Sequence, residues 1–255
     1  MGQQQSTLAE NFLRYFDIAF AASKAQKREV YGIRYSVYCE EFGYEPAHLF
    51  PNHEETDTFD AASLHVLVTH KGSGLPAGCV RLVSPTGVGG VDLLPFESNC
   101  EHSLDEDFIR RLHLDRATVC EISRLAVDGA FRRRAGERIT RFGEVEGLDC
   151  TQQERRTFSM IAVACFLAAT ALTELTGRTN VFAMMEPFLP RLLQRSGIVF
   201  ARAGQDIDYH GLRAPYFITT QSALDNMLGD LKELYTEIHT RVSQGFEADA
   251  VMAGR

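Results

Sequence analysis

One helix-length segment constrains the fold more than any other part of the chain. Thr157–Leu175 is apolar on nearly every side of the helix that its length and composition predict. Such a helix must pack against other helices or strands on every face. Its longest uninterrupted apolar run, Met160–Ala169, is too short to span a bilayer. The segment therefore predicts the buried helix of a globular domain, and no transmembrane segment is expected.

Short stretches with strand patterns lie before and after this helix. Two of them flank the Gly-containing turn Lys71–Gly74 and alternate apolar with polar residues, so they predict a hairpin. The hydrophobic content of 45% is enough for a full core around such strands. The predicted strands are Leu64–His70, Ala77–Val83, Thr118–Val127, Val181–Met185, Ile198–Ala203 and Pro215–Thr220.

Helices are predicted around these strands. Residues 8–30 carry Phe12, Tyr15, Phe16 and Ala19 at helical spacing. The pattern as a whole predicts a single α/β domain over residues 1–255, with a mixed sheet flanked by helices, N-terminal helices at about 8–42 and a C-terminal helix at about 224–242. The remaining predicted helices are Lys27–Phe42, Leu104–Leu114, Pro187–Arg195 and Leu224–Val242, and Pro85–Glu101 is expected to be rich in loops.

Charge and cysteine content narrow the class of protein. The net charge of −8 argues against nucleic acid as a partner, because phosphate contacts need a basic surface. The six cysteines form no C-x-x-C pair and sit among apolar neighbours, which predicts reduced, mostly buried thiols and no metal site. The absence of a signal-peptide pattern predicts a cytoplasmic protein.

The predicted strand Thr118–Val127 holds two opposite charges in an otherwise apolar sequence. Strict alternation puts Glu121 and Ser123 on one face and Arg124 on the other. A β-bulge would insert one extra residue and bring both charges to one side, as bulges beside active sites often do. The alternative is a pair of unrelated contacts on the two faces, and the residues alone leave both interpretations open.

A basic cluster follows this strand in a chain that is acidic overall. Arg132, Arg133 and Arg134 precede Gly136, and two more arginines follow. A loop after a strand can aim backbone N–H groups at a phosphate, so the segment fits coenzyme A, phosphopantetheine or the acidic face of an acyl carrier protein. A solvated basic loop is the alternative.

Two carboxylates, Asp57 and Asp60, stand shortly before the predicted hairpin. They could orient an amine, although acidic loops are common and a solvated loop is the competing interpretation. His48 and His53 lie nearby in the sequence, but their spacing is poor evidence for a metal.

Five short motifs occur in an order that resembles one group of acyltransferases. This order resembles the acyl-homoserine-lactone synthases and the N-acyl amino acid synthases. It is closer still to the acyltransferases associated with the exosortase (PEP-CTERM) system. The resemblance covers roughly residues 10–220. The motifs are Arg34-x-x-Val37-Tyr38, Phe42-Gly43-Tyr44-Glu45, Asp57-x-x-Asp60, Arg81-Leu82 and Glu121-x-Ser123-Arg124.

The resemblance implies a GNAT-like fold in a bacterial cytoplasmic enzyme. In that fold the fourth strand carries a bulge and splays from the fifth, and the thioester donor lies in the gap. Thr118–Val127 would be the fourth strand and Val181–Met185 the fifth, so that Glu121 and Arg124 would serve one cleft.

Residue roles follow from the resemblance and from the needs of acyl transfer. Glu121 is the expected base, with Ser123 and Arg124 as the other catalytic residues. Plain core packing is the alternative for the acyl-pocket residues. The acceptor would be bound by Arg34, Tyr38, Tyr44, Asp57, Asp60 and Arg81. The donor would be bound by Leu125, Ala126, Val127, Arg132, Arg133, Arg134 and Gly136. The acyl chain would be bound by Phe166, Val181 and Met184.

Departures from the family pattern shape the expected substrates. Arg138 fills the last position of the acyl-CoA loop motif, where GNAT enzymes have Gly or Ala, which argues against simple acetyl-CoA use. Tyr44 stands where lactone synthases have Trp, which argues against S-adenosylmethionine as acceptor. We expect N-acylation of an amino acid or related small amine. The donor would be a long-chain acyl carrier protein or coenzyme A thioester, and no permanently bound cofactor is expected.

Three other functions stay open on the sequence. The chain could be a lactone synthase that uses S-adenosylmethionine, or a small-amine acetyltransferase that uses acetyl-CoA. A non-catalytic module that binds acyl carrier protein is the third. Turnover with different donors and acceptors separates all of them.

Overall fold

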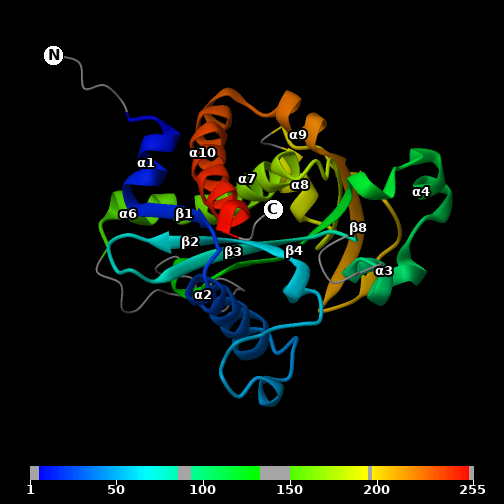
Figure 1. The fold of residues 1–255 in the computed structure, drawn as a ribbon, viewed down its shortest axis with the longest axis horizontal. Coiled ribbons are helices and arrows are strands. Elements are labelled where there is room, and N and C mark those ends of the chain that lie inside the picture. The colour runs from blue at the N-terminus through cyan, green and yellow to red at the C-terminus, as the bar shows by residue number, and fades with distance from the viewer. Residues whose placement is uncertain (1–5, 86–92, 133–149, 195–196, 253–255) are drawn as a thin grey trace.

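A single mixed sheet runs through the molecule and separates two sets of helices (Figure 1). This computed structural model describes residues 6–85, 93–132, 150–194 and 197–252, and within them the sheet has eight strands. The strand order is β1-β2-β3-β4-β5-β8-β6, with β7 paired to β8 off this path. Only β4 and β5 pair in parallel among these strands. The predicted α/β architecture is confirmed.

Most of the predicted strands are confirmed in position, but β2, β3 and β8 bury four or more consecutive residues and do not alternate between buried and exposed. The hairpin is confirmed, because β2 and β3 pair antiparallel across the predicted turn. The predicted strand Ile198–Ala203 is wrong in extent, since only two of its residues form β6. The strands are β1 Phe16–Phe20, β2 Leu64–His70, β3 Pro76–Val83, β4 Val119–Val127, β5 Asn180–Met185, β6 Ala201–Arg202, β7 Ile207–Asp208 and β8 Leu212–Thr219.

The helices form two layers. α7, α10 and α1 lie on one side of the sheet and α2 lies on the other (Figure 1). The helices are α1 Leu8–Tyr15, α2 Lys24–Arg34, α3 Pro95–Cys100, α4 Glu106–Leu112, α5 Gly129–Arg132, α6 Gln152–Thr157, α7 Met160–Leu175, α8 Leu189–Gln194, α9 Thr220–Asn226 and α10 Gly229–Met252; a π-helix, Tyr35–Glu41, continues α2.

The buried helix is confirmed as α7. Ile161, Leu167 and Leu172 are fully buried, and α7 packs against β2, β3 and β4 on one side and α10 on the other. Its cover by protein on both sides explains why the sequence shows no polar face. No helix within the described ranges has the length and apolar content that crossing a membrane requires.

The N-terminal prediction is wrong at one point. Residues 8–30 are not continuously helical, because α1 ends at Tyr15 and β1 follows at once. Phe16, Ile18 and Phe20 alternate inward and are buried, with Asp17 more exposed between them. Phe12 and Phe16 are spaced four apart, which fits either a helix or this junction, so the helical period hid the strand.

The C-terminal helix is also not a single element. α9 ends at Asn226 and α10 begins at Gly229, so the predicted helix Leu224–Val242 is interrupted at Met227 and Leu228. Met227 has an extended backbone with φ −64° and ψ 131°, and its side chain is buried. Because this residue is buried at the turn, it is apolar, and the helical spacing of apolar residues continues in the sequence across the break.

Candidate active site

A bulge in β4 places charged side chains on one face of the sheet. Cys79 pairs with Ala126 and Arg81 pairs with Ser123, so two residues of β4, Arg124 and Leu125, stand opposite a single residue of β3. Arg124 takes a left-handed backbone with φ 50°. The predicted bulge is confirmed. It lets Ser123 and Arg124 point to the same side, where α2 lies.

β4 and β5 separate directly after Glu121. The two strands pair only from Val119 with Asn180 to Glu121 with Phe182, whereas β5 stays paired with β8 as far as Met185. The predicted identities of the fourth and fifth strands and the splay between them are confirmed. Glu121 therefore occupies the last paired position, at the mouth of the gap.

Glu121 is a buried carboxylate with a perturbed affinity for protons. Its side chain is 2% exposed, and Oε2 accepts a hydrogen bond of 2.8 Å from the backbone N–H of Phe96. Burial raises the pKa of Glu121 to about 7, although the Phe96 N–H and the positive charges of Arg81 and Arg124 act in the opposite direction. A carboxylate with this pKa can both take up and release a proton near neutral pH.

Arg34 anchors the acidic loop from the end of α2. Its guanidinium is fully buried and donates to both oxygens of Asp60, at 2.6 and 2.9 Å, and through Nε to Glu55. The charge and hydrogen bonds of Arg34 hold the pKa of Asp60 well below its usual range despite burial. Asp60 thus stays ionised inside the protein.

Arg81 extends this arrangement to β3 and β4. Its Nη1 donates to Asp57 at 2.6 Å and to Asp60 at 2.9 Å, and its Nε donates to the Ser123 hydroxyl at 3.1 Å. Ser123, predicted as catalytic, therefore acts as a hydrogen-bond acceptor that orients Arg81. The Nη2 of Arg81 is buried and has no hydrogen-bond partner among the described residues.

Arg124 completes the cluster from the bulge. Its Nη2 lies 3.2 Å from Glu55, 3.4 Å from Asp57 and 3.5 Å from Glu45, while its buried Nε has no partner within the described part of the chain. The Tyr38 ring lies 5.4 Å from the Arg124 guanidinium carbon. We call Arg34, Arg81, Arg124, Glu45, Glu55, Asp57 and Asp60 the acid–arginine network.

Aromatic side chains cover one flank of this network. The Tyr38 hydroxyl donates to the carbonyl of Leu125 at 3.2 Å, which ties the π-helix to the bulge. The Tyr44 ring lies tilted against the His210 ring, with centroids 5.6 Å apart, and His210 Nε2 lies 3.5 Å from Glu45. Burial and the positive charges of Arg124 and Arg213 lower the pKa of His210.

The predicted acceptor residues are thus brought together. Arg34, Asp57, Asp60 and Arg81 are hydrogen-bonded in one cluster, and Tyr38 and Tyr44 border it. Sequence reasoning gave no role to Glu55, which belonged to the acidic loop, or to Glu45, which closes one of the motifs. It also missed His210, because nothing in its sequence context links it to the earlier motifs.

The predicted donor residues are described only in part. Ala126 and Val127 are buried at the end of β4. Arg132 donates from Nε to the Val127 carbonyl at 2.6 Å, forms an ion pair with Glu41 and lies over the Phe42 ring. Its charge is thus already paired within the chain. Arg133, Arg134 and Gly136 lie outside the described residues.

The three predicted acyl-pocket residues do not share one face. β5 alternates, so Val181 packs into the core on the α7 side, while Met184 packs with Phe182 on the other side. Phe166 in α7 contacts Phe200, with ring centroids 5.8 Å apart. The assignment of these residues to the acyl chain stays a prediction, with Val181 and Met184 on opposite faces of β5 because a strand turns successive side chains to opposite sides.

A cavity of about 220 Å³ lies beyond the end of β5. Apolar residues after β5, Tyr216 of β8 and two arginines line it. Phe200 links it to Phe166 on α7. Its lining residues are Pro187, Pro190, Arg191, Gln194, Val199, Phe200, Arg202 and Tyr216.

Comparisons with known proteins agree with this geometry. A family model described as an acetyltransferase (GNAT) domain matches residues 33–141. The crystal structure of TofI in a ternary complex with an inhibitor and MTA is 19% identical, with a TM-score of 0.58 over 83% of this chain and 95% of that chain. No match was found among curated proteins.

Two further solved structures are similar in the same way. The AHL synthase LasI is 15% identical, with a TM-score of 0.55 over 84% of this chain and 96% of that chain. FeeM, an N-acyl amino acid synthase from uncultured soil microbes, is 12% identical, with a TM-score of 0.55 over 84% and 94%. Structural similarity at sequence identities this low shows a shared fold, and the predicted GNAT-like fold is confirmed.

Proposed function

We propose that this protein is an N-acyltransferase that moves an acyl group from a thioester to the amine of an amino acid or a related small molecule. The observation that carries the proposal is Glu121, a buried carboxylate with a pKa of about 7 at the point where β4 and β5 separate. The match of residues 33–141 to an acetyltransferase model supports acyl transfer as the reaction class.

The acceptor side is assigned to the acid–arginine network. Arg81 Nη2 and Arg124 Nε are buried donors without partners in the described structure, and such groups favour an anionic or carbonyl ligand. The half-buried Glu45 and Asp57 offer negative charge to an ammonium group. An α-amino acid presents both groups, which supports it as the acceptor class.

The reaction needs one proton transfer and one exchange of bonds. The acceptor nitrogen attacks the thioester carbonyl carbon, and Glu121 takes the amine proton directly or through a water. Collapse of the tetrahedral intermediate forms the amide and breaks the C–S bond, and the departing thiolate takes up a proton. That proton is the one Glu121 took from the amine, passed on directly or through a water, so Glu121 returns to its ionised starting state and no redox partner is involved.

The donor is assigned to the gap between β4 and β5. The bulge leaves one residue of β4 outside the regular ladder with β3, and backbone N–H groups of Leu125, Ala126 or Val127 would hold the thioester oxygen and pantetheine. The cavity lined by Phe200, which contacts Phe166, is a candidate site for the acyl chain. Acyl carrier protein as the donor partner and the link to an exosortase system stay predictions from the sequence.

The test is thiol release from acyl carrier protein and coenzyme A thioesters, from acetyl to palmitoyl, with pooled amino acids or with S-adenosylmethionine. We expect release with a long-chain donor and an amino acid, and an N-acyl amino acid as the product in mass spectrometry. Release only with S-adenosylmethionine would make the protein a lactone synthase, a possibility that the similarity to LasI keeps open. If none of the tested donors releases thiol, the proposal is overturned.

Two variants connect the activity to the site. Glu121→Gln keeps an acceptor for the Phe96 N–H but removes the base, so turnover should be lost while donor binding persists. Glu106→Gln, on an exposed turn of α4, is the control and should keep full turnover. Arg124→Lys retains the charge but loses the guanidinium donors, and it should raise the KM for the acceptor about tenfold or more.

A further inference from the structure

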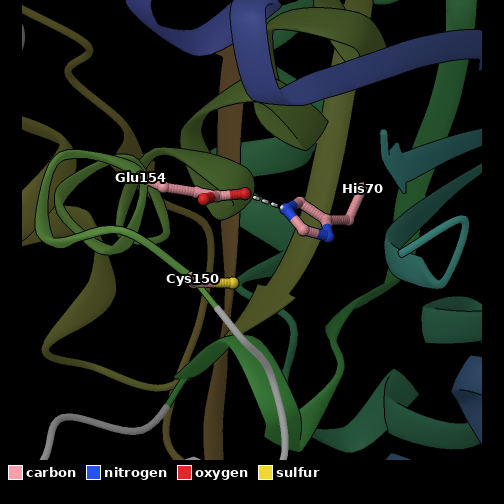
Figure 2. Close-up of side chains that lie close together, drawn as sticks. All are labelled: His70, Cys150 and Glu154. Atoms are coloured by element: carbon pink, nitrogen blue, oxygen red, sulfur yellow. Dashed lines mark hydrogen bonds and ion pairs between the residues drawn. The ribbon is translucent and has the colours of Figure 1, made fainter. Parts of the chain in front are cut away.

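Three metal-ligating side chains meet at a place separate from the acid–arginine network (Figure 2). His70 ends β2, Glu154 lies in α6, and Cys150 comes shortly before that helix. One ligand atom from each residue, an imidazole nitrogen, the Cys150 sulfur and a carboxylate oxygen, lies within 4.8 Å of the other two. Figure 2 shows the sulfur and the carboxylate both extending toward the imidazole.

We propose that His70, Cys150 and Glu154 bind one Zn²⁺ ion, with water as a fourth ligand. A mixed set of nitrogen, sulfur and oxygen suits Zn²⁺ better than Mg²⁺ or Ca²⁺, which take oxygen ligands. Two ligand atoms on a tetrahedral Zn²⁺ with bonds of about 2.0 Å are roughly 3.3 Å apart. His70 Nε2 and Glu154 Oε1 are now 2.6 Å apart, so a small rotation of the glutamate side chain makes room.

Neighbouring groups already orient two of the three ligands. The Ser73 hydroxyl lies 2.8 Å from His70 Nδ1, and Glu154 accepts a hydrogen bond of 3.1 Å on Oε2 from the backbone N–H of Thr151. Metal sites use such outer contacts to hold the imidazole and carboxylate in place. The Ser73 backbone N–H now donates to His70 Nδ1 at 3.3 Å; when Zn²⁺ takes Nε2, the ring proton moves to Nδ1, this contact opens and Ser73 Oγ accepts the proton.

The surroundings favour a cluster with no net charge. The rings of Phe16, Phe131 and Phe158 lie 5.2, 5.4 and 6.2 Å from the His70 ring, and His70 is 2% exposed. One Zn²⁺ with a thiolate, a carboxylate and a neutral imidazole sums to zero charge, so its burial among these rings costs little. The thiol proton of Cys150 leaves to solvent on binding, which makes the affinity rise with pH.

An entry path exists on the solvent side. Cys150 is half-buried, and Gly72 and Ser73 in the turn between β2 and β3 are exposed. A Cβ atom at Gly72 would lie 3.1 Å from His70 Cε1 and 3.6 Å from Glu154 Oε1, so this backbone passes close over the cluster. The bound ion would join this turn to the start of α6, beside Phe131 in α5.

The sequence favoured no metal site because His70 and Glu154 are 84 residues apart and follow no ligand spacing. The fold brings them together. This inference does not depend on the proposed acyl transfer, because the cluster lies at the far end of β2 from His65, which borders the acid–arginine network.

The experiment uses the full chain, freed of metal with a chelator and titrated with Zn²⁺ and separately with Co²⁺. We expect one ion per chain, a higher melting temperature with Zn²⁺, and a thiolate-to-cobalt charge-transfer band. Cys150→Ser should remove the band, and Glu154→Gln should weaken binding at least tenfold. Cys39→Ser, a thiol on the π-helix, is the matched control and should keep both the band and the stoichiometry.

Two results would overturn the site. One is a wild-type chain whose melting temperature and spectrum do not respond to either ion. The other is a Cys150→Ser variant that binds Co²⁺ with an unchanged spectrum. Because serine is close in size to cysteine, this variant separates loss of a ligand from loss of the fold, and circular dichroism of the variant checks that point.

Discussion

At the scale of single residues, the buried carboxylates of the site fall into two kinds, those paired with an arginine and one that is not. Asp60 and Glu55 are buried but fully paired with Arg34, whereas Glu121 is buried with one backbone hydrogen bond and two arginines at longer range. Asp60 stays ionised, whereas the sparsely paired Glu121 becomes a group that titrates near neutral pH. Under the proposed function, Glu121 is therefore the proton-transfer group, and Asp60 serves to hold the arginines in place.

The raised pKa of Glu121 has a consequence for stability. In the unfolded chain Glu121 ionises above about 4.5, but in the folded protein it stays protonated up to about 7. The folded state binds more protons between these values, so the free energy of unfolding falls as the pH rises through this window, by about 3 kcal/mol in total. Glu121→Gln should therefore be more stable than the wild type at pH 8, with a difference that shrinks toward pH 4.5.

Thermal unfolding of both proteins at several pH values measures this difference. Glu106→Gln serves again as the control, because its exposed carboxylate should leave the pH dependence unchanged. An unchanged or lower melting temperature for Glu121→Gln at pH 8 would contradict the assignment of a strained, buried carboxylate.

His65 should change the free energy of unfolding with pH in the opposite direction to Glu121. It is fully buried, both ring nitrogens lack hydrogen-bond partners among the described residues, and burial lowers its pKa to about 3. The unfolded chain takes up a proton below about 6.5 and the folded chain does not, so stability falls as the pH drops through this range. His65→Phe keeps the ring against Tyr31 and should flatten the fall between pH 6.5 and 4.

Urea unfolding at steps of pH tests this variant. The exposed His102, replaced by Gln, should reproduce the wild-type curve. A His65→Phe curve as steep as that of the wild type would show that His65 is charged or solvated in the folded protein.

The residues of the site were partly predictable from the sequence. Glu121 and Arg124 were recognisable as charges in an apolar strand, and Asp57 and Asp60 as a pair before a hairpin. Glu55 looked the same as its solvated neighbours, because its burial comes from Arg34, which lies 21 residues earlier. His210 comes from the turn between β7 and β8, and only the tertiary fold brings that turn to Glu45.

At the scale of elements, β3 packs closely against β4 and α7 next to the bulge. Gly78 in β3 faces α7 so closely that an added Cβ atom would lie 2.7 Å from Ile161 Cγ2 and 3.2 Å from the Ala126 carbonyl. Gly78→Ala should destabilise the protein by about 1–3 kcal/mol, because the strand or the helix must move. Gly32→Ala in α2 is the matched control, since its Cβ would meet nothing within 4 Å.

Chemical denaturation of the two glycine variants gives the comparison. Gly32→Ala should be neutral or stabilising by about 1 kcal/mol, as expected inside a helix. The Gly78→Ala effect should be partly relieved by Ile161→Leu, which removes the Cγ2 methyl group. Equal stability of Gly78→Ala and the wild type would mean that β3 and α7 are not tightly packed.

The helices and strands differ in how well the sequence predicted them. β2 and β3 are strands of seven and eight mostly apolar residues on either side of a Gly-containing turn, and α7 is apolar over most of its length, so all three were recognisable from the sequence. β1 has only five residues, and its first phenylalanine also fits the period of α1. β7 has two residues and owes its existence to pairing with β8, which no local pattern encodes.

At the scale of the whole molecule, the two faces of the sheet have separate tasks. The face with α7 and α10 carries the main apolar core, and the face with α2 carries the acid–arginine network (Figure 1). α10 packs on α7, β1 and α1, with Leu234, Ile238 and Val242 fully buried. Stability and chemistry should therefore respond to different mutations.

Ile238→Ala tests this separation. The change leaves a cavity under α10 and should reduce the free energy of unfolding by about 2–5 kcal/mol. Turnover measured well below the melting temperature should stay unchanged, because the network lies across the sheet. Glu237→Ala, one residue earlier and exposed, should alter neither property. A loss of turnover in folded Ile238→Ala would show that the two faces are coupled.

The placement of the acid–arginine network along the chain has a consequence for how such proteins diversify. All seven of its residues lie between Arg34 and Arg124, while β5 and β8, which form the other wall of the splay, begin only at Asn180. Under the proposed function, acceptor choice and acyl-chain choice are thus encoded in different stretches of the gene. Point mutation or recombination in one stretch can change one substrate while the residues for the other are inherited intact.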